Sequence, residues 1–353
     1  MAENNATILI PDISGFTEFM TTTELNHSSH AINILIDAML KAIGDEYEVA
    51  EIEGDAVLLI KKGPAPSKKE IEEICLKIFN AFHFQRKWMQ QYTICPCGAC
   101  QAIINLTLKF VAHHGPLAEI TIGKFVKHSG PEMIVAHRLL KNSINNNEYL
   151  LMTEKLLSQS TDITGIADME WISSSDEYAS IGKVDYRFAL LNDIRRTIPE
   201  PPPPPKYNNS DTTIFAETIL PANGIDAHLA LTNFPGRNEW LPGLIKTEQD
   251  FPTAFIGSVH RCIFNDYTAV VSPLRMSVTD EGIMYAESCR YEDLDLSIVN
   301  EFVFKKISTS TCTVAARFTN TSEIILSEAI NTILLRRLRL IVESLKVFLE
   351  KSR

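Results

Sequence analysis

Asp12 and Asp55 are the acidic residues whose surroundings best suit a metal or phosphate site. Asp12 follows a short apolar run, and a glycine turn at Gly15 then leads into a helical pattern that opens with Phe16 and Thr17. A carboxylate at a strand end can hold a divalent cation while backbone N–H groups at a helix start face a phosphate. The same junction could equally be a plain strand–turn–helix corner that Asp12 merely caps.

Asp55 lies in a second pattern of the same kind. Two runs rich in β-forming residues, 49–52 and 56–60, flank the dipeptide Gly54-Asp55. A Gly-Asp pair between two such runs predicts a β-hairpin with Asp55 at its turn.

Taken in order, Asp12-Ile13-Ser14-Gly15-Phe16 and Gly54-Asp55 resemble the two metal-binding motifs of the class III nucleotidyl cyclases. The resemblance implies that Asp12 and Asp55 bind two ions, Mg²⁺ or Mn²⁺, that clamp a nucleoside triphosphate. It also implies that Gly15, Phe16 and Thr17 lie beside the nucleotide and that two copies form a homodimer.

The family also has a glycine-started helix whose Asn and Arg stabilise the transition state from the partner subunit. The matching segment here is 130–138, in which Gly130, Ala136 and Arg138 fit the pattern and Ile134 replaces the asparagine. Isoleucine cannot donate a hydrogen bond, and loss of one positioned donor typically costs about 2.7–4 kcal/mol of barrier. Arg138 is therefore the candidate catalytic residue, although it could also be an ordinary arginine on a helix surface.

Base selection in the family rests on two positions, which are Glu51 and Lys127 in this chain. The Lys/Asp pair that reads adenine has thus become Glu/Lys, with the charges exchanged. Either another base is read, or the two residues form a salt bridge that fills the purine pocket, and we favour the second. Lys183 approximates the phosphate-binding lysine of the family.

Three cysteines, Cys95, Cys97 and Cys100, lie within six residues, and two histidines follow about a dozen residues later. Thiolates and imidazoles at this density could hold a structural Zn²⁺. No second Cys-x-x-Cys completes the site, so reduced thiols in a tight turn are the competing interpretation.

The composition sets limits on the class of protein. The 353 residues are 22% charged and 45% hydrophobic, which is typical of a globular protein with room for two cores. A formal net charge of −11 argues against nucleic acid as a partner, and no apolar run is long enough to span a bilayer. Seven cysteines and no signal peptide favour a cytoplasmic protein with reduced thiols.

A run of prolines at 201–205 marks a boundary. We expect a cyclase-like domain over 1–195, a stiff proline-rich linker over 196–206 and a second domain over 207–353. The mixture of helices and hairpin-linked strands in the first domain predicts an α+β fold, a ferredoxin-like sandwich with a mostly antiparallel sheet.

The second domain shows several strands followed by one long amphipathic helix over 323–351. This order resembles the START-like helix-grip fold, an antiparallel sheet that grips a C-terminal helix. The resemblance implies a cavity for a small apolar ligand, for which we name Trp240, Leu338 and Ile341 as lining residues. A filled core without a cavity is the alternative.

Two functions follow from these patterns. In the first, the chain is a divergent cyclase-like module that binds metal and nucleotide, performs little or no cyclase chemistry, and is regulated by ligand binding to the helix-grip domain. In the second, it is an active homodimeric cyclase that makes a cyclic nucleotide from ATP or GTP. Ile134 and the Glu51/Lys127 exchange favour the first.

Overall fold

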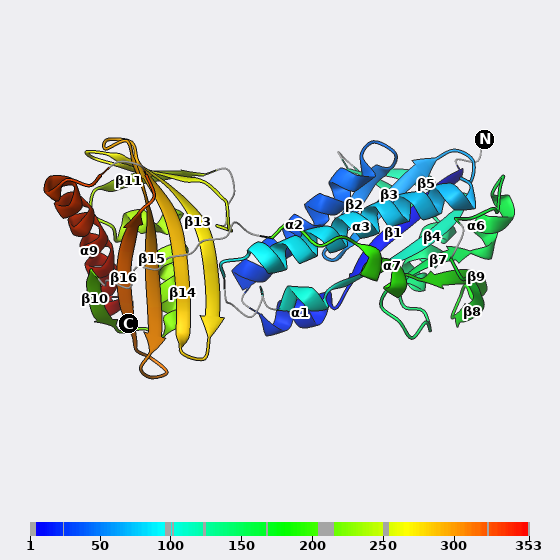
Figure 1. Ribbon diagram of the computed structural model, residues 1–353. Helices are drawn as coiled ribbons and strands as arrows, with labels where there is room; N and C mark the ends of the chain where they lie inside the picture. The colour runs from blue at the N-terminus through cyan, green and yellow to red at the C-terminus, as the bar shows by residue number, and fades with distance from the viewer. Residues whose placement is uncertain are drawn as a thin grey trace. The chain divides into compact units, whose positions relative to one another are not determined.

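The computed structural model describes residues 5–23, 25–95, 100, 102–122, 125–166, 169–203, 215–249, 254–322 and 325–351. The chain forms two compact units, each considered by itself here (Figure 1). Unit 1 consists of Met1–Gln90 and Gly98–Pro201, and unit 2 of Gln91–Cys97 and Pro202–Arg353. The chain therefore passes between the units three times.

Unit 1 alternates helices with strands along the chain. Its elements are β1 (Asn5–Ser14), α1 (Phe16–Thr22), α2 (Leu25–Ile43), β2 (Glu48–Glu53), β3 (Ala56–Lys62), α3 (Lys68–Tyr92, which runs into unit 2), β4 (Thr107–Pro116), β5 (Ala118–Ile122), β6 (Phe125–Ser129), α5 (Pro131–Leu139), β7 (Tyr149–Thr153), α6 (Glu154–Gln159), β8 (Ile172–Tyr178), β9 (Gly182–Leu190) and α7 (Asn192–Thr197).

Seven of these strands form one mixed sheet in the order β2-β3-β1-β4-β7-β9-β8, and β5 pairs only with β6. Among the described strands of this sheet, β4 and β7 run parallel and the other neighbours are antiparallel. The central strand β1 is buried almost throughout, which explains its continuous apolar run. The predicted α+β class with a mostly antiparallel sheet is confirmed.

Helices cover both faces of β1 and β4. On one face, Ile8 and Ile10 of β1 pack with Met133 and Ala136 of α5. On the other, α3 buries an apolar stripe that includes Phe79, whose ring lies 6.5 Å from that of Phe110 on β4. Asp12 shares the parity of Ile8 and Ile10, so strand alternation places its side chain on the α5 face.

Unit 2 is a seven-stranded antiparallel sheet with one long C-terminal helix, as predicted. Its strands, in the order β10-β16-β15-β14-β13-β12-β11, are accompanied by two helices. The elements are β10 (Ala216–Leu220), α8 (Gly224–Thr232), the 3₁₀ turn η2 (Pro235–Glu239), β11 (Leu244–Gln249), β12 (His260–Phe264), β13 (Thr268–Thr279), β14 (Gly282–Tyr291), β15 (Leu296–Lys306), β16 (Cys312–Asn320) and α9 (Glu328–Lys351).

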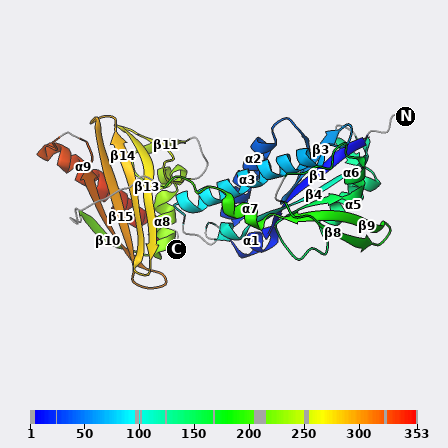
Figure 2. The same ribbon diagram turned by 45° about the vertical axis from the view of Figure 1, so that its right-hand side comes forward.

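The helix α9 lies against this sheet in both views of the ribbon (Figures 1 and 2). Its buried residues recur every three or four positions, which gives one apolar stripe: Leu334, Leu338, Val342, Leu345 and Leu349. Strand β16 alternates buried and partly exposed residues, as expected for a sheet with one covered face.

The short segment 91–97 belongs to unit 2 although the sequence places it in the middle of unit 1. Ile94 is part of the unit 2 core, and its carbonyl accepts a hydrogen bond from Nε2 of the buried His228 at 2.5 Å. The backbone N–H of Ile256 donates to the carbonyl of Tyr92 at 2.9 Å. These contacts differ from the expected organisation, in which residues 1–195 form one domain.

The start of the proline-rich stretch is held to its own unit by side chains. Lys87 donates to the carbonyl of Ile198 at 2.7 Å and pairs with Glu200 at 2.6 Å. The hydroxyl of Tyr92 donates to the carbonyl of Pro202 at 2.7 Å. Residues 204–206 of the expected linker lie outside the described residues.

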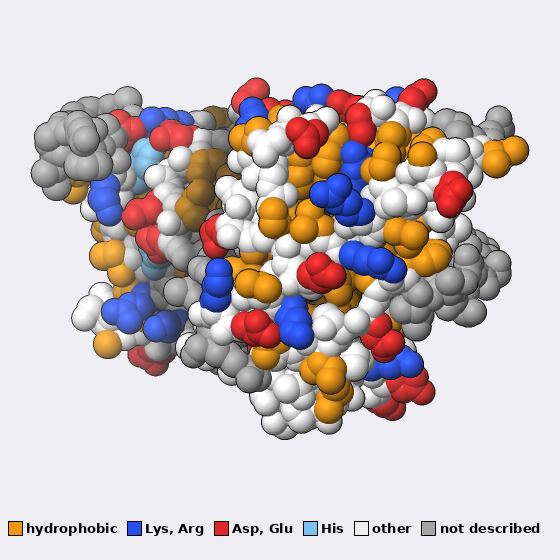
Figure 3. Space-filling model, turned by 90° about the vertical axis from the view of Figure 1, so that its left-hand side faces the viewer, with side chains coloured by type: hydrophobic (Ala, Val, Ile, Leu, Met, Phe, Trp, Pro, Cys, Tyr) orange, Lys and Arg blue, Asp and Glu red, His pale blue; other side chains and the backbone are white. Residues whose placement is uncertain are grey.

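Acidic, basic and hydrophobic side chains are interspersed over the face drawn in Figure 3, without a large patch of one charge among the described residues. Of the helices described, none has the length and apolar character needed to cross a membrane.

Candidate functional site

The two predicted metal-binding residues meet at one corner of unit 1. The backbone N–H of Ile13, next to Asp12, donates to the carbonyl of Asp55 at 3.0 Å. Gly15 follows with φ = 88°, a left-handed conformation that favours glycine and turns the chain from β1 into α1. The antiparallel pairing of β1 and β3, with Asp12 opposite Ala56, therefore brings the two motifs together.

Lys109, which the sequence analysis did not single out, pairs with Asp12. It lies opposite Asp12 on β4, and its Nζ is 3.0 Å from Oδ2 of Asp12. The same ammonium donates to the carbonyl of Leu140 at 3.1 Å. The side chains of Asp12 and Lys109 are 12% and 18% exposed, so the pair is mostly removed from water. The sequence signal for this residue was a lysine within an apolar strand, between Leu108 and Phe110, which are both buried.

The charges of Asp12 and Lys109 affect the pKa of Asp55. Burial and the negative charge of Asp12 raise the pKa of the Asp55 carboxyl above its ordinary value, while Lys109 opposes this effect. The corner thus holds two carboxyl groups, of Asp12 and Asp55, and one ammonium group, of Lys109.

At this corner an ammonium group lies where the cyclase resemblance implies a metal ion beside Asp12. Lys109 already occupies Oδ2 of Asp12, and a divalent cation there would have to displace it. Over the described parts of the chain, no group of three or more His, Cys, Asp or Glu residues could hold a metal ion. The corner therefore carries its own cation in the form of an ammonium group.

The two expected base-reading residues do contact each other. Nζ of Lys127 lies 3.5 Å from Oε1 of Glu51, with the side chains 65% and 41% exposed. The salt bridge is therefore present, but it lies at the surface rather than in a narrow cleft, where such pairs add little stability.

The helix α5 places the other two expected determinants at the surface. Ile134, which replaces the asparagine of the family, is 55% exposed, and Arg138 is exposed one turn later. Nδ1 of the neighbouring His137 lies 3.8 Å from Glu53 on β2. The exposed position of Arg138 leaves it accessible to a partner subunit.

Lys183 lies far from the Asp12 corner of its own chain. Lys109 is level with Tyr149 on β7, which pairs with Leu190 on β9. Lys183 is seven residues from Leu190 along β9, or roughly 20 Å at the rise of a strand. It pairs instead with Asp185 at 2.6 Å. Lys183 therefore makes no phosphate contact at the corner of its own chain, and its assignment as a phosphate-binding lysine of a dimer stays a prediction.

The glycine turn has a packing role. The ring of Phe16 lies against the β2–β3 turn, where a Cβ added to Gly54 would be 3.8 Å from it. Gly54 itself has φ = 64°, as a turn glycine requires. Thr17 is exposed in the first turn of α1, a helix of seven residues.

The thiol cluster is only partly described. Cys95 and Cys100 are partly buried, and Cys97 lies outside the described residues. The zinc hypothesis for Cys95, Cys97 and Cys100 therefore stays a prediction.

The helix-grip cavity is much smaller than expected. Trp240 and Leu338 are buried in the core of unit 2, and Ile341 lines a space of about 20 Å³ between α9 and the sheet. Ligand pockets are usually some 300–1,000 Å³. In this conformation the helix and sheet are packed together, so an apolar ligand of ordinary size does not fit unless α9 moves.

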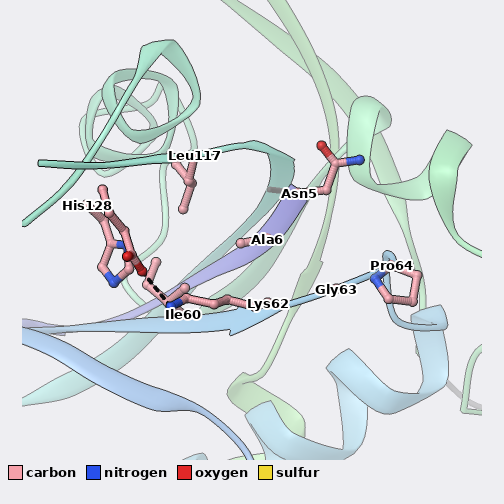
Figure 4. A pocket seen from close by; sticks show the side chains of 9 residues that line it. Asn5, Ala6, Ile60, Lys62, Gly63, Pro64, Leu117 and His128 are labelled. Carbon is pink, nitrogen blue, oxygen red and sulfur yellow. Dashed lines mark hydrogen bonds and ion pairs between the residues drawn. The ribbon is translucent and has the colours of Figure 1, made fainter. Parts of the chain in front are cut away.

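A larger pocket that the sequence did not predict lies at the opposite end of β1 from Asp12 (Figure 4). Its volume is about 520 Å³, and it is lined by Asn5, Ala6, Ile60, Lys62, Gly63, Pro64, Leu117, Glu119 and His128. Lys62 pairs with Glu119 at 2.5 Å across it. Because these charges satisfy each other, the pocket does not select a ligand of either charge.

Part of the chain matches a family model and a curated relative. Residues 32–149 match the family described as "Protein of unknown function (DUF2652)". Over 110 residues the chain is 33% identical to "Uncharacterized protein Rv2561/Rv2562" of Mycobacterium tuberculosis (strain ATCC 25618 / H37Rv), which covers 30% of this chain. The match spans 50% of the length of that relative.

Several solved structures similar to the N-terminal half of the chain are nucleotidyl cyclases. The guanylyl cyclase Cya2 is 14% identical with a TM-score of 0.37, over 52% of this chain and 91% of that one. The adenylyl cyclase CyaB from P. aeruginosa is 15% identical with a TM-score of 0.36, over 53% and 94%. A bacterial light-regulated adenylyl cyclase is 14% identical with a TM-score of 0.38, over 55% and 95%.

Proposed function

We propose that unit 1 is a cyclase-like regulatory module without cyclase activity, controlled by a small ligand that binds unit 2. The observation that carries this proposal is the ion pair between Asp12 and Lys109 at 3.0 Å. An ammonium fixed on one of the two expected metal-binding carboxylates neutralises the charge that would otherwise attract a divalent cation. A triphosphate brought to this corner would then lack the cations that neutralise it during phosphoryl chemistry.

The surrounding residues support the same conclusion. Ile134 offers no hydrogen bond to a reacting ribose. Glu51 and Lys127 satisfy each other without a base. Each of these departures removes an interaction that a cyclase makes in its transition state, so together they lower the rate rather than only the affinity.

The alternative is an active homodimeric cyclase acting on ATP or GTP with Mg²⁺ or Mn²⁺. The observation in its favour is the convergence of Asp12 and Asp55 at one corner, joined by the hydrogen bond from Ile13 to Asp55. In that case a cation would displace Lys109 when the nucleotide arrives, and Arg138 of the partner subunit would complete the site.

The test separates the two functions. The full-length chain is incubated with ATP or GTP and with Mg²⁺ or Mn²⁺, and cyclic product is measured alongside nucleotide affinity by calorimetry. We expect no cyclic product above the buffer control. Cyclic product that is made by the wild type and abolished by Asp12→Asn would establish the alternative. Asp193→Asn, at an exposed position on α7, serves as the matched control for loss of a carboxylate.

A further inference from the structure

A group of polar side chains interrupts the apolar inner face of the unit 2 sheet. Glu287 on β14 and Asn300 on β15 are direct cross-strand neighbours. Both are buried, with 1% and 2% of their surface exposed. The inner-face positions on either side of Asn300, Ile298 and Phe302, are buried hydrophobic residues. A polar pair in the middle of an apolar face is unusual, because the packing of the sheet on α9 does not need it.

Glu287 has its partners within the fold. Nη2 of Arg237 lies 3.0 Å from Oε2 of Glu287, and the hydroxyl of Tyr285 donates to the same oxygen at 2.9 Å. Nε of Arg237 donates to the carbonyl of Leu231 at 2.7 Å. The positive and negative charges of this cluster therefore balance.

Asn300 has no such partner. Its Oδ1 is fully buried, and it has no hydrogen-bond donor among the described residues. A buried acceptor without a donor is costly, and native proteins keep few of them unless a water or a ligand completes the bond.

Asn300 is one of the residues that line the small cavity beneath α9. The cavity measures about 20 Å³, enough for one water-sized group, and its other polar lining residues include Glu287 of β14 and Arg237 of η2. Ile341 and Arg337 line it from α9. The space is therefore the size of a single hydroxyl rather than of a complete ligand.

Arg337 holds the helix over this cavity. Its guanidinium lies 3.6 Å from the ring centre of Tyr267 and 4.4 Å from that of Tyr291. It also pairs with Asp293 at 2.7 Å, beyond the end of β14. A single side chain on α9 thus links the helix to the β12–β13 connection and to β14, and its release would free the helix to move away from the cavity.

We propose that this cavity is the closed head-group end of a pocket in unit 2 that takes a neutral, apolar molecule bearing a hydroxyl group. The hydroxyl donates to Oδ1 of Asn300, while the apolar part lies between α9 and the sheet after Arg337 releases. The proposal rests on the proposed ligand-binding role of unit 2 and specifies the class of ligand. A charged head group is disfavoured because Arg237 and Arg337 are already matched by Glu287 and Asp293, which leaves an added charge desolvated and unpaired.

The test uses three probes with one tail and different head groups: 1-octanol, octanoate and octylammonium. Binding to the full-length chain is measured by calorimetry for the wild type, Asn300→Leu and Arg337→Ala. Arg336→Ala is the matched control, because Arg336 is the exposed neighbour on α9. We expect the wild type and Arg336→Ala to bind 1-octanol in preference to the charged probes. Arg337→Ala should bind it about tenfold more tightly, and Asn300→Leu at least tenfold more weakly.

A second measurement separates a lost ligand contact from a damaged fold. Asn300→Leu removes a buried unpaired acceptor, so we expect its unfolding temperature to rise by about 2–4 °C. Equal binding of 1-octanol by wild type and Asn300→Leu, equal binding of octanoate, or no binding of any probe even by Arg337→Ala would each overturn the proposal. None of these results depends on whether unit 1 makes cyclic product, so failure here and failure of the regulatory role remain distinguishable.

Discussion

Two mostly buried ion pairs, one in each unit, differ in how completely their charges are satisfied. In unit 2, Glu287 receives both Arg237 and the hydroxyl of Tyr285, and the charges cancel. In unit 1, Lys109 pairs with Asp12, but Asp55 adds a second carboxylate whose pKa is raised by burial and by Asp12. The pair of Arg237 and Glu287 is a closed pair, in the sense that its charges cancel, and it supports the fold. The arrangement in unit 1 retains unmatched negative charge, so it should respond to added cations once the lysine is removed.

The largest effect is expected from breaking the closed pair. Arg237→Met leaves Glu287 buried without a cation, which typically costs about 3–5 kcal/mol. The double variant Arg237→Met/Glu287→Leu removes both charges and should recover most of this loss, measured by urea unfolding of unit 2. Arg261→Met, at an exposed pair with Glu292, should leave the transition unchanged. If Arg237→Met behaves like this control, the pair contributes nothing to the fold.

A pH effect on unit 2 should come next in size. Burial, followed by the charge of Arg237, lowers the pKa of His260 to about 4, and burial lowers that of His228 to about 4. Because both are neutral in the folded state and ordinary histidines titrate near 6.5, protonation favours unfolding. The contribution of these neutral histidines to the free energy of unfolding should therefore be fully present above about pH 6.5. It should be lost as the pH falls towards 4.

This pH dependence can be assigned by substitution. His260→Gln keeps hydrogen-bonding capacity towards Ser258 and Gln249 but cannot titrate. Thermal unfolding between pH 7 and 5 should therefore show a smaller loss for this variant than for the wild type. An equal loss in both would mean that His260 does not contribute in this range.

The sequence predicted helices and strands well, but it did not predict which side chains contact each other across the sheet. The α+β class and the long helix α9 followed from runs of apolar residues and from turn glycines, which are local signals. The joint role of Asp12 and Asp55 came from the resemblance to the cyclases and not from these signals. Lys109 was missed because its role depends on lying opposite Asp12, and strand register across nearly a hundred residues cannot be seen locally.

Segment 91–97 shows a second limit of sequence reading. Composition pointed to the prolines at 201–205 as the boundary, and they do lie close to one. The other two crossings occur near the end of α3 and within the cysteine cluster, which the sequence analysis interpreted as a possible zinc site and not as a boundary. Only the tertiary contacts of Ile94, in the core of unit 2, reveal that this stretch belongs there.

A smaller effect is expected at the pair of Lys109 and Asp12 in unit 1. Lys109→Met leaves Asp12 and Asp55 without a cation, and we expect a loss of about 1–3 kcal/mol in stability. Mn²⁺ should then raise the unfolding temperature of Lys109→Met more than that of the wild type, because the cation replaces the ammonium. Lys77→Met, at an exposed position, is the matched control. Equal Mn²⁺ stabilisation of all three proteins would show that Lys109 does not compete with metal.

The smallest effect is expected at the surface pair of Glu51 and Lys127. Because the side chains are 41% and 65% exposed, solvent screens their attraction, and Glu51→Gln should change stability by less than about 1 kcal/mol. The same variant tests base reading. If the pair only satisfies itself, ATP and GTP affinities measured by calorimetry should be unchanged by Glu51→Gln and by Lys127→Met. A selective loss of GTP affinity in Glu51→Gln would instead mean that the carboxylate reads a purine edge, since a base-reading group lost from a site changes one nucleotide far more than the other.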